Sequence, residues 1–146
     1  MKDFFQDKFE YDFFASKNWI ESIESQEDFM SEFTISSMSH ILNAHHIWNR
    51  RLLGKKVESE LWDVFPVQFL QKLLEENYRE TNEYLEKLER TEKIKYHSSE
   101  GVLFEKSTID ILYHILNHSN YHRAQIALDL KQNGLKNPNF NFISYH

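Results

Sequence analysis

Cysteine is absent from this chain of 146 residues, and glycine and proline are scarce. Without cysteine there is no disulfide framework, thiolate zinc site or cysteine nucleophile, so nitrogen and oxygen atoms must hold any bound metal. Only 3 Gly and 2 Pro interrupt the chain, while 12 Phe, 7 Tyr and 3 Trp supply bulk. This composition favours long helices with aromatic packing over a strand-and-turn architecture.

Two further absences bear on partners and location. The chain has no block of basic residues and carries 17 Lys and Arg against 23 Asp and Glu, a net charge of -6, which argues against nucleic acid. No apolar run approaches the roughly 18 residues of a membrane span, and charges interrupt the N-terminal MKDFFQDKFEYDFF. We therefore expect a cytoplasmic protein that acts on a small molecule, with one domain over residues 1–146.

Apolar residues recur at helical spacing in four segments, which predicts an all-α fold. The predicted helices cover residues 3–25, 36–54, 66–90 and 108–134. Four amphipathic helices with two longer connections indicate a four-helix bundle, either antiparallel or with a crossover. Bundles build ligand sites from side chains on facing helices, so a site here should draw residues from at least two segments.

Local signals set the ends of the predicted helices. Thr34 or Ser36 can cap the second helix and Gly54 can end it, while a hydroxyl at residues 107–108 can cap the fourth. Residues 93–106, KIKYHSSEGVLFEK, alternate apolar and polar side chains around SSEG. That alternation predicts a short hairpin before the fourth helix.

Two histidines lie one helical turn apart in the fourth segment, within NHSNYHRAQI. His118 and His122 are separated by about 40° and about 6 Å on a helix, so both imidazoles can reach one ion. His114 extends the row, but it lies about 12 Å from His122 along the axis and cannot share that ion. The pair is therefore either half of a metal site completed from another helix, or a polar strip beside the core.

The second helix offers three candidates for a third ligand: His40, His45 and His46. On a helical wheel, His45 points near the centre of the apolar stripe, whereas His40 points away from it, among small residues. Periodicity alone favours His45. A second buried face around His40 would permit the other choice.

Several motifs resemble the DinB/YfiT-like family, four-helix bundles that carry a three-residue metal site. The fourth-helix YHILNHSNYHRAQI resembles the family pattern N-H-x-x-x-H-R-x-Q, which is the most specific of them. SMSHILNAHHIWNRRLLG resembles its second-helix motif, EYDFFASKNWIES its first-helix motif and FISYH its aromatic ending.

The resemblance implies that His40, His118 and His122 are the metal ligands. It leaves His45, where relatives often have an acidic residue, as a supporting or alternative ligand. Three neutral imidazoles suit a divalent ion, Zn²⁺ or Ni²⁺ first and Fe, Cu or Mn as alternatives, and they leave positions open for water or substrate.

Other polar residues are candidates to support such a site. Four of them could accept the second N–H of a ligating imidazole, or line the helix surface: Tyr113, Asn117, Gln125 and Asp129. Tyr11 or Glu10 could face the site from the first helix. Ser119 stands where a zinc protease has its catalytic Glu, which sets that class aside.

The resemblance implies a transferase that uses a low-molecular-weight thiol, whose pKa the metal would lower before attack on a small electrophile. Metal-dependent hydrolysis is the second enzymatic reading. The non-enzymatic alternative is a stress-associated metal-binding protein that forms a homodimer through an aromatic helix face.

Overall fold

The apolar spacing correctly predicts four long helices. The computed structural model describes residues 1–138 and 141–145, so His146 of the FISYH motif lies outside the described residues. The four helices are α1 (Lys2–Ser25), α2 (Glu32–Leu53), α3 (Val67–Glu86) and α4 (Thr108–Gln132). Smaller elements are the 3-10 turn η1 (Glu27–Phe29), strands β1 (Lys93–His97) and β2 (Leu103–Ser107), and the short helix α5 (Phe142–Tyr145).

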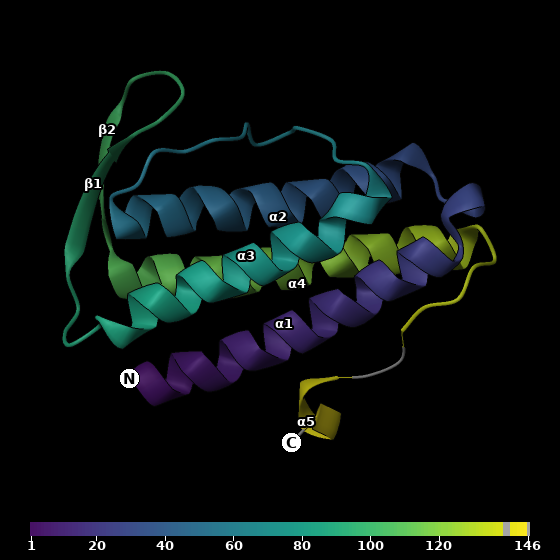
Figure 1. Cartoon of the computed structure of the whole chain (residues 1–146), viewed down its shortest axis with the longest axis horizontal. Helices are drawn as coiled ribbons and strands as arrows, with labels where there is room; N and C mark the ends of the chain where they lie inside the picture. Colours follow the sequence, from purple (N-terminus) through teal and green to yellow (C-terminus); the bar gives the residue numbers. More distant parts are fainter. Residues whose placement is uncertain (139–140, 146) are drawn as a thin grey trace.

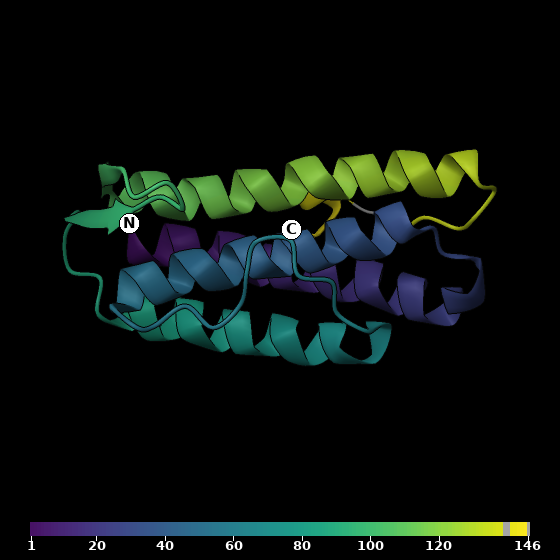
Figure 2. The ribbon, with the colours of Figure 1, turned by 90° about the horizontal axis from the view of Figure 1, so that it is seen from above.

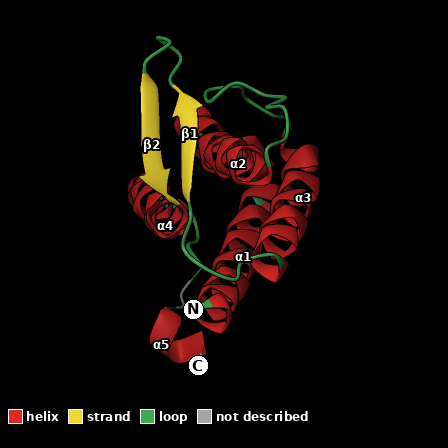
Figure 3. Cartoon of the chain, turned by 90° about the vertical axis from the view of Figure 1, so that its left-hand side faces the viewer, coloured by secondary structure: helices red, strands yellow, loops and turns green. Residues whose placement is uncertain are grey.

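The bundle has a crossover, because α2 and α3 run in the same direction while α1 and α4 run in the other (Figure 1). Seen along the bundle, α2 lies between α3 and α4, and the hairpin stands beside α2 and α4 at one end (Figure 3). α1 packs mainly against α3, and its contact with α4 is sparser. No helix within the described residues is long and apolar enough to cross a membrane.

The crossover connection, residues 54–66, returns along α2 without forming a helix or strand (Figures 1 and 2). Four hydrogen bonds join side chains of α2 to its backbone: Glu58 N–H to His46 Nε2 (3.4 Å), Phe65 N–H to Ser39 Oγ (3.1 Å), Asn43 Nδ2 to the Asp63 carbonyl (2.8 Å), and His40 Nδ1 to the Leu61 carbonyl (3.1 Å). The connection therefore covers a face of α2 that the other helices leave open.

The buried interior consists of two apolar clusters. One holds side chains of α1, α2, α3 and α4, including Ile20, Met38, Leu70 and Ile126. The other also draws on all four helices and includes Phe9, Leu52, Leu85 and Leu112. Buried polar groups accompany these clusters, among them His45, Asn49, Asn77 and Thr81, and the Asp12–Arg123 pair.

The helix ends differ from the prediction in two places. α2 starts earlier, because the Ser31 side chain, not Thr34 or Ser36, caps it by accepting from the Thr34 N–H. Gly54 ends α2 as predicted, with a φ of 65° that a side chain would strain. α3 stops at Glu86, four residues before the predicted end.

The predicted hairpin is present. β1 and β2 pair antiparallel, with Lys93 opposite Ser107 and His97 opposite Leu103. Ser107 then caps α4 by accepting from the Ile109 N–H. β1 also contacts α2, so the hairpin ties the start of α4 to the neighbouring helix.

Candidate metal centre

Three histidines from two helices meet between α2 and α4. His118 and His122 lie side by side on α4 with ring centroids 4.4 Å apart, as their spacing predicts. His40 of α2 completes the group, with its centroid 4.9 Å from His118 and 4.6 Å from His122. One ring nitrogen from each residue lies within 4.8 Å of the others, so the group could hold a divalent metal ion.

Hydrogen bonds orient two of these rings. His40 Nδ1 lies 3.1 Å from the Leu61 carbonyl, and His122 Nδ1 lies 2.8 Å from Gln125 Oε1. Both oxygens are acceptors, so each imidazole donates from Nδ1 and turns the lone pair of Nε2 toward the group. His118 Nε2 lies 3.1 Å from His40 Nε2, and a proton or a cation must lie between two such nitrogens. The donor set therefore fits a divalent metal.

The environment keeps imidazoles of this group neutral, as metal binding requires. Burial first, and then the neighbouring His122, His40 and His114, lower the pKa of His118 to about 3. Burial also lowers the pKa of His40, although the hydrogen bond to the Leu61 carbonyl opposes that shift. At neutral pH neither ring has to lose a proton before it can bind a cation.

His40 and His118 open on a cleft of about 1100 Å³. Its walls come from α2, α4, the crossover connection and the turn of the hairpin. Trp62 of the connection stacks on His40 with ring centroids 3.7 Å apart and an angle of 9° between the planes. A small molecule in the cleft would therefore lie beside the histidines.

His45, which the helical wheel favours, is placed elsewhere. It is buried between α2 and α3, and its Nε2 lies 2.8 Å from Thr81 Oγ1. Thr81 donates its own hydrogen to Asn49 Oδ1 (3.1 Å), so His45 must donate to Thr81. Its Nε2 is thus protonated and occupied, and burial lowers the pKa of His45 to about 4.

The structure places the candidate supporting residues of α4 in different surroundings. Gln125 orients His122, as its position suggested. Asp129 instead accepts hydrogen bonds from Ser31 (2.6 Å) and Thr34 (2.8 Å), at the start of α2. The Leu61 carbonyl is a partner that the sequence did not indicate, because a backbone atom leaves no signature in residue type.

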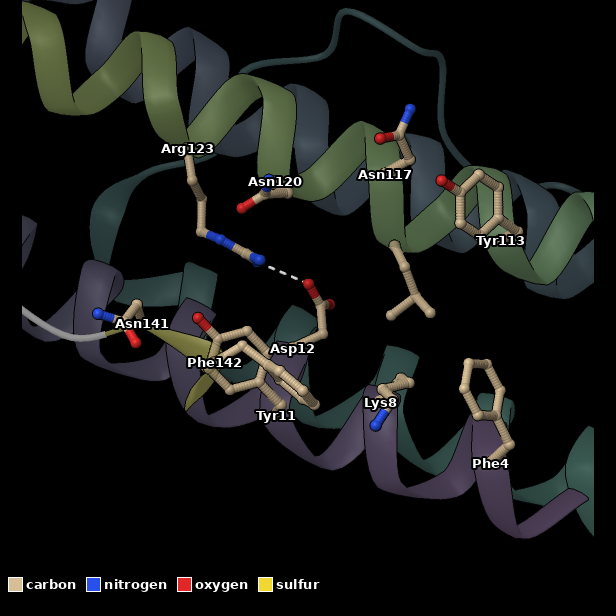
Figure 4. A pocket seen from close by; sticks show the side chains of 11 residues that line it. Phe4, Lys8, Tyr11, Asp12, Tyr113, Asn117, Asn120, Arg123, Asn141 and Phe142 are labelled. Carbon is tan, nitrogen blue, oxygen red and sulfur yellow. Dashed lines mark hydrogen bonds and ion pairs between the residues drawn. The ribbon is translucent and has the colours of Figure 1, made fainter. Parts of the chain in front are cut away.

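The opposite side of α4 forms a second pocket of about 470 Å³ with α1 and α5 (Figure 4). Tyr11, Tyr113 and Asn117 line this pocket, so none of them faces the histidines. Arg123 reaches down from α4 and donates to Asp12 (2.6 Å) of α1 (Figure 4), and also to Ser16 (2.8 Å). Arg123 and Asp12 are 5% and 3% exposed, which makes this a buried and already paired site.

Comparison with known proteins agrees with this geometry. The model of the DinB family matches residues 17–146, a span that includes all three histidines of the group. None of the curated proteins matches the chain.

Proposed function

Because the chain belongs to the DinB family, we propose that His40, His118 and His122 bind one divalent metal ion in a thiol-dependent transferase. The observation that carries the proposal is the convergence of three ring nitrogens within 4.8 Å at the edge of a large cleft. Zn²⁺ and Ni²⁺ are the first candidates, because both accept imidazole ligands in this number.

The arrangement supports a catalytic role for the metal more than a structural one. A structural zinc site is normally closed by four protein ligands, whereas three ligands leave a position for substrate. Among the described residues, no carboxylate joins the three histidines within 4.8 Å. The accessible side of the group borders the cleft, which has room for a small thiol and its electrophile.

When bound, the cation would supply Lewis acidity that lowers the pKa of a coordinated thiol. The residues of the chain would hold the ion and orient the imidazole rings that bind it. The Leu61 carbonyl fixes the His40 ring, Gln125 fixes the His122 ring, and Trp62 covers one face of His40. These contacts hold the imidazoles in place before a ligand enters.

Thiol transfer is preferred to hydrolysis because, within residues 1–138 and 141–145, the group that could hold the metal consists of imidazoles and includes no carboxylate. Ser119, which takes the place of the zinc-protease Glu, is buried and 1% exposed. A thiol that binds the metal as its thiolate does not need such a base. This chemistry suits a group made of imidazoles alone.

Metal analysis of the tag-free chain tests the site. We expect about one ion per chain, and loss of the ion in His118→Ala/His122→Ala and in His40→Ala. His46→Ala is the matched control, because His46 is half-buried and lies on α2 outside the group. Unchanged metal content in the double variant would refute the site.

The reaction is tested separately, with a panel of low-molecular-weight thiols and electrophiles. We expect conjugate formation that requires the added metal and disappears in the double variant. If the chain binds metal but turns over no thiol and is a tight dimer, the non-enzymatic alternative is correct.

A further inference from the structure

Arg51, near the end of α2, lies against two aromatic rings that contact each other edge to face. Its guanidinium carbon lies 4.6 Å from the Trp48 ring on the same helix and 4.3 Å from the Tyr96 ring on β1. No carboxylate within residues 1–138 and 141–145 pairs with it. The next residue back, Arg50, contacts Glu58, Glu76 and Glu80. Two adjacent arginines thus differ completely in their partners.

The free guanidinium lines the same cleft as the histidines. Contacts between aromatic rings connect the histidines to Arg51. The ring centroids of His118 and His114 are 5.5 Å apart, those of His114 and Trp48 are 5.6 Å apart, and Trp48 contacts Arg51. Among the described residues that line the cleft, Arg51 is the only arginine or lysine. Glu60 and Asp63 line it from the crossover connection, so an anion would be favoured at the Arg51 end.

The contacts of Arg51 leave its binding edge available. Both rings lie on one side of the guanidinium, so the N–H groups on its other side remain available to match the two oxygens of a carboxylate. Burial lowers the pKa of Arg51, although Tyr96 opposes that shift, so its hydration is already reduced. Less water has to be removed when an anion binds there.

We propose that Arg51 is a specificity-determining residue that binds a carboxylate of the thiol or of the electrophile in the metal cleft. The inference rests on the proposed function for the identity of these ligands. It assigns them a chemical class, carboxylate-bearing small molecules with their reacting atom at the histidines and their anionic end at Arg51. Neutral analogues of the same size lack that second attachment.

Two pairs of probes test the assignment and distinguish the sources of the carboxylate. S-methylglutathione and its dimethyl ester represent the thiol without a free sulfhydryl, and 4-chloro-3-nitrobenzoate and its methyl ester represent the electrophile. Ligand-observed NMR titrations measure binding with and without Zn²⁺. We expect one acid to bind at least about ten-fold more tightly than its ester, and the pair that shows this ratio identifies the source.

Substitutions of Arg51 test whether this residue causes the difference in affinity between acid and ester. Arg51→Met, which can still pack against Trp48 and Tyr96, should bring the ratio close to one, and Arg51→Lys should retain part of it. Arg79→Met is the matched control for charge, because Arg79 is exposed on α3 and outside the cleft. Metal content should be normal in all three.

Equal binding of acid and ester in both pairs, or a ratio that survives Arg51→Met, would overturn the assignment. Failure of the proposed function gives a different result, because it shows as missing metal or as absence of thiol conjugation. S-methylglutathione and the benzoate can still be titrated against the metal-free chain.

Discussion

His122 and Arg123 are neighbours in sequence, yet they belong to opposite sides of α4. His122 faces α2 and joins a group of three converging ring nitrogens, in which His40 and His122 turn lone pairs inward. Arg123 faces α1, where Asp12 and Ser16 accept its hydrogen bonds. Both sides are polar, but the first brings together ring nitrogens that could hold a cation, whereas the second is an internally paired ion pair. Polarity alone therefore does not distinguish the two sides of α4; the way in which their polar groups are paired does.

The sharpest test of this comparison is to replace each of the two neighbours in turn and to measure both the stability and the metal content of the variant. Arg123→Met leaves the Asp12 carboxylate buried and unpaired, so we expect a loss of about 3–5 kcal/mol in the free energy of unfolding. Metal stoichiometry of the folded fraction should be unchanged. Urea unfolding of the metal-free chain and metal analysis measure the two quantities.

His122→Ala should do the reverse, abolishing metal binding with less than about 1 kcal/mol change in metal-free stability. The double change Asp12→Leu/Arg123→Met removes both charges and should recover most of the lost stability. A large metal-free loss in His122→Ala would show that the histidines are also part of the folding core.

A pH titration extends the comparison to a histidine that is already hydrogen-bonded. His45 has a folded pKa of about 4, below the ordinary value of about 6.5, so the unfolded state binds more protons between these values. Its contribution is therefore complete above pH 6.5 and lost as the pH falls toward 4. We expect a decrease of roughly 3 kcal/mol across this window.

The comparison variant is His45→Gln, which removes the titrating ring and keeps a donor for Thr81. Urea unfolding of the two metal-free proteins at several pH values isolates the contribution, since His118 titrates in both. Parallel pH profiles would show that His45 does not account for the loss.

Gln125→Leu weakens the metal side of α4 without removing a ligand. The His122 ring would lose the acceptor for its Nδ1–H, and loss of such a partner costs about 10–100-fold in metal affinity. Competition with a chelator of known affinity measures the change. Asn120→Leu on the opposite side of the helix is the control and should leave the affinity unaltered.

Trp62→Ala should have the smallest effect. The indole stacks on His40, but it is 62% exposed, so removing it should cost about 0.5–1.5 kcal/mol or less in stability and only a few-fold in metal affinity. Thermal unfolding and the same chelator competition measure both. A loss as large as that of His40→Ala would mean that Trp62 holds the ring in place.

The helices could be predicted because their apolar residues repeat locally, and the His118–His122 pair could be predicted because it lies on one helix. The choice between His40 and His45 could not. The wheel correctly placed His45 toward the apolar centre, and the structure shows it buried there against Thr81. It could not show that a non-helical connection would cover the face around His40, because that depends on contacts distant in sequence.

The same limit applies to the second side of α4. Arg123 and Asp12 are 111 residues apart in the chain, and no periodicity links them. Asp129 was a candidate acceptor for an imidazole N–H, but helix packing brings it to Ser31 at the start of α2. Residue spacing predicts neighbours within a helix, whereas partners across helices follow from how the bundle assembles.

The crossover connection has a consequence for how this protein can change over evolutionary time. Four of its bonds to α2 use backbone atoms, those of Glu58, Leu61, Asp63 and Phe65, so most substitutions at these positions leave those four bonds in place. Removing one residue would shift the chain by about 3.3 Å and move the Leu61 carbonyl out of reach of His40. The length of residues 54–66 should therefore be kept more strictly than the side chains at these bonded positions, whereas surface connections ordinarily tolerate insertions and deletions.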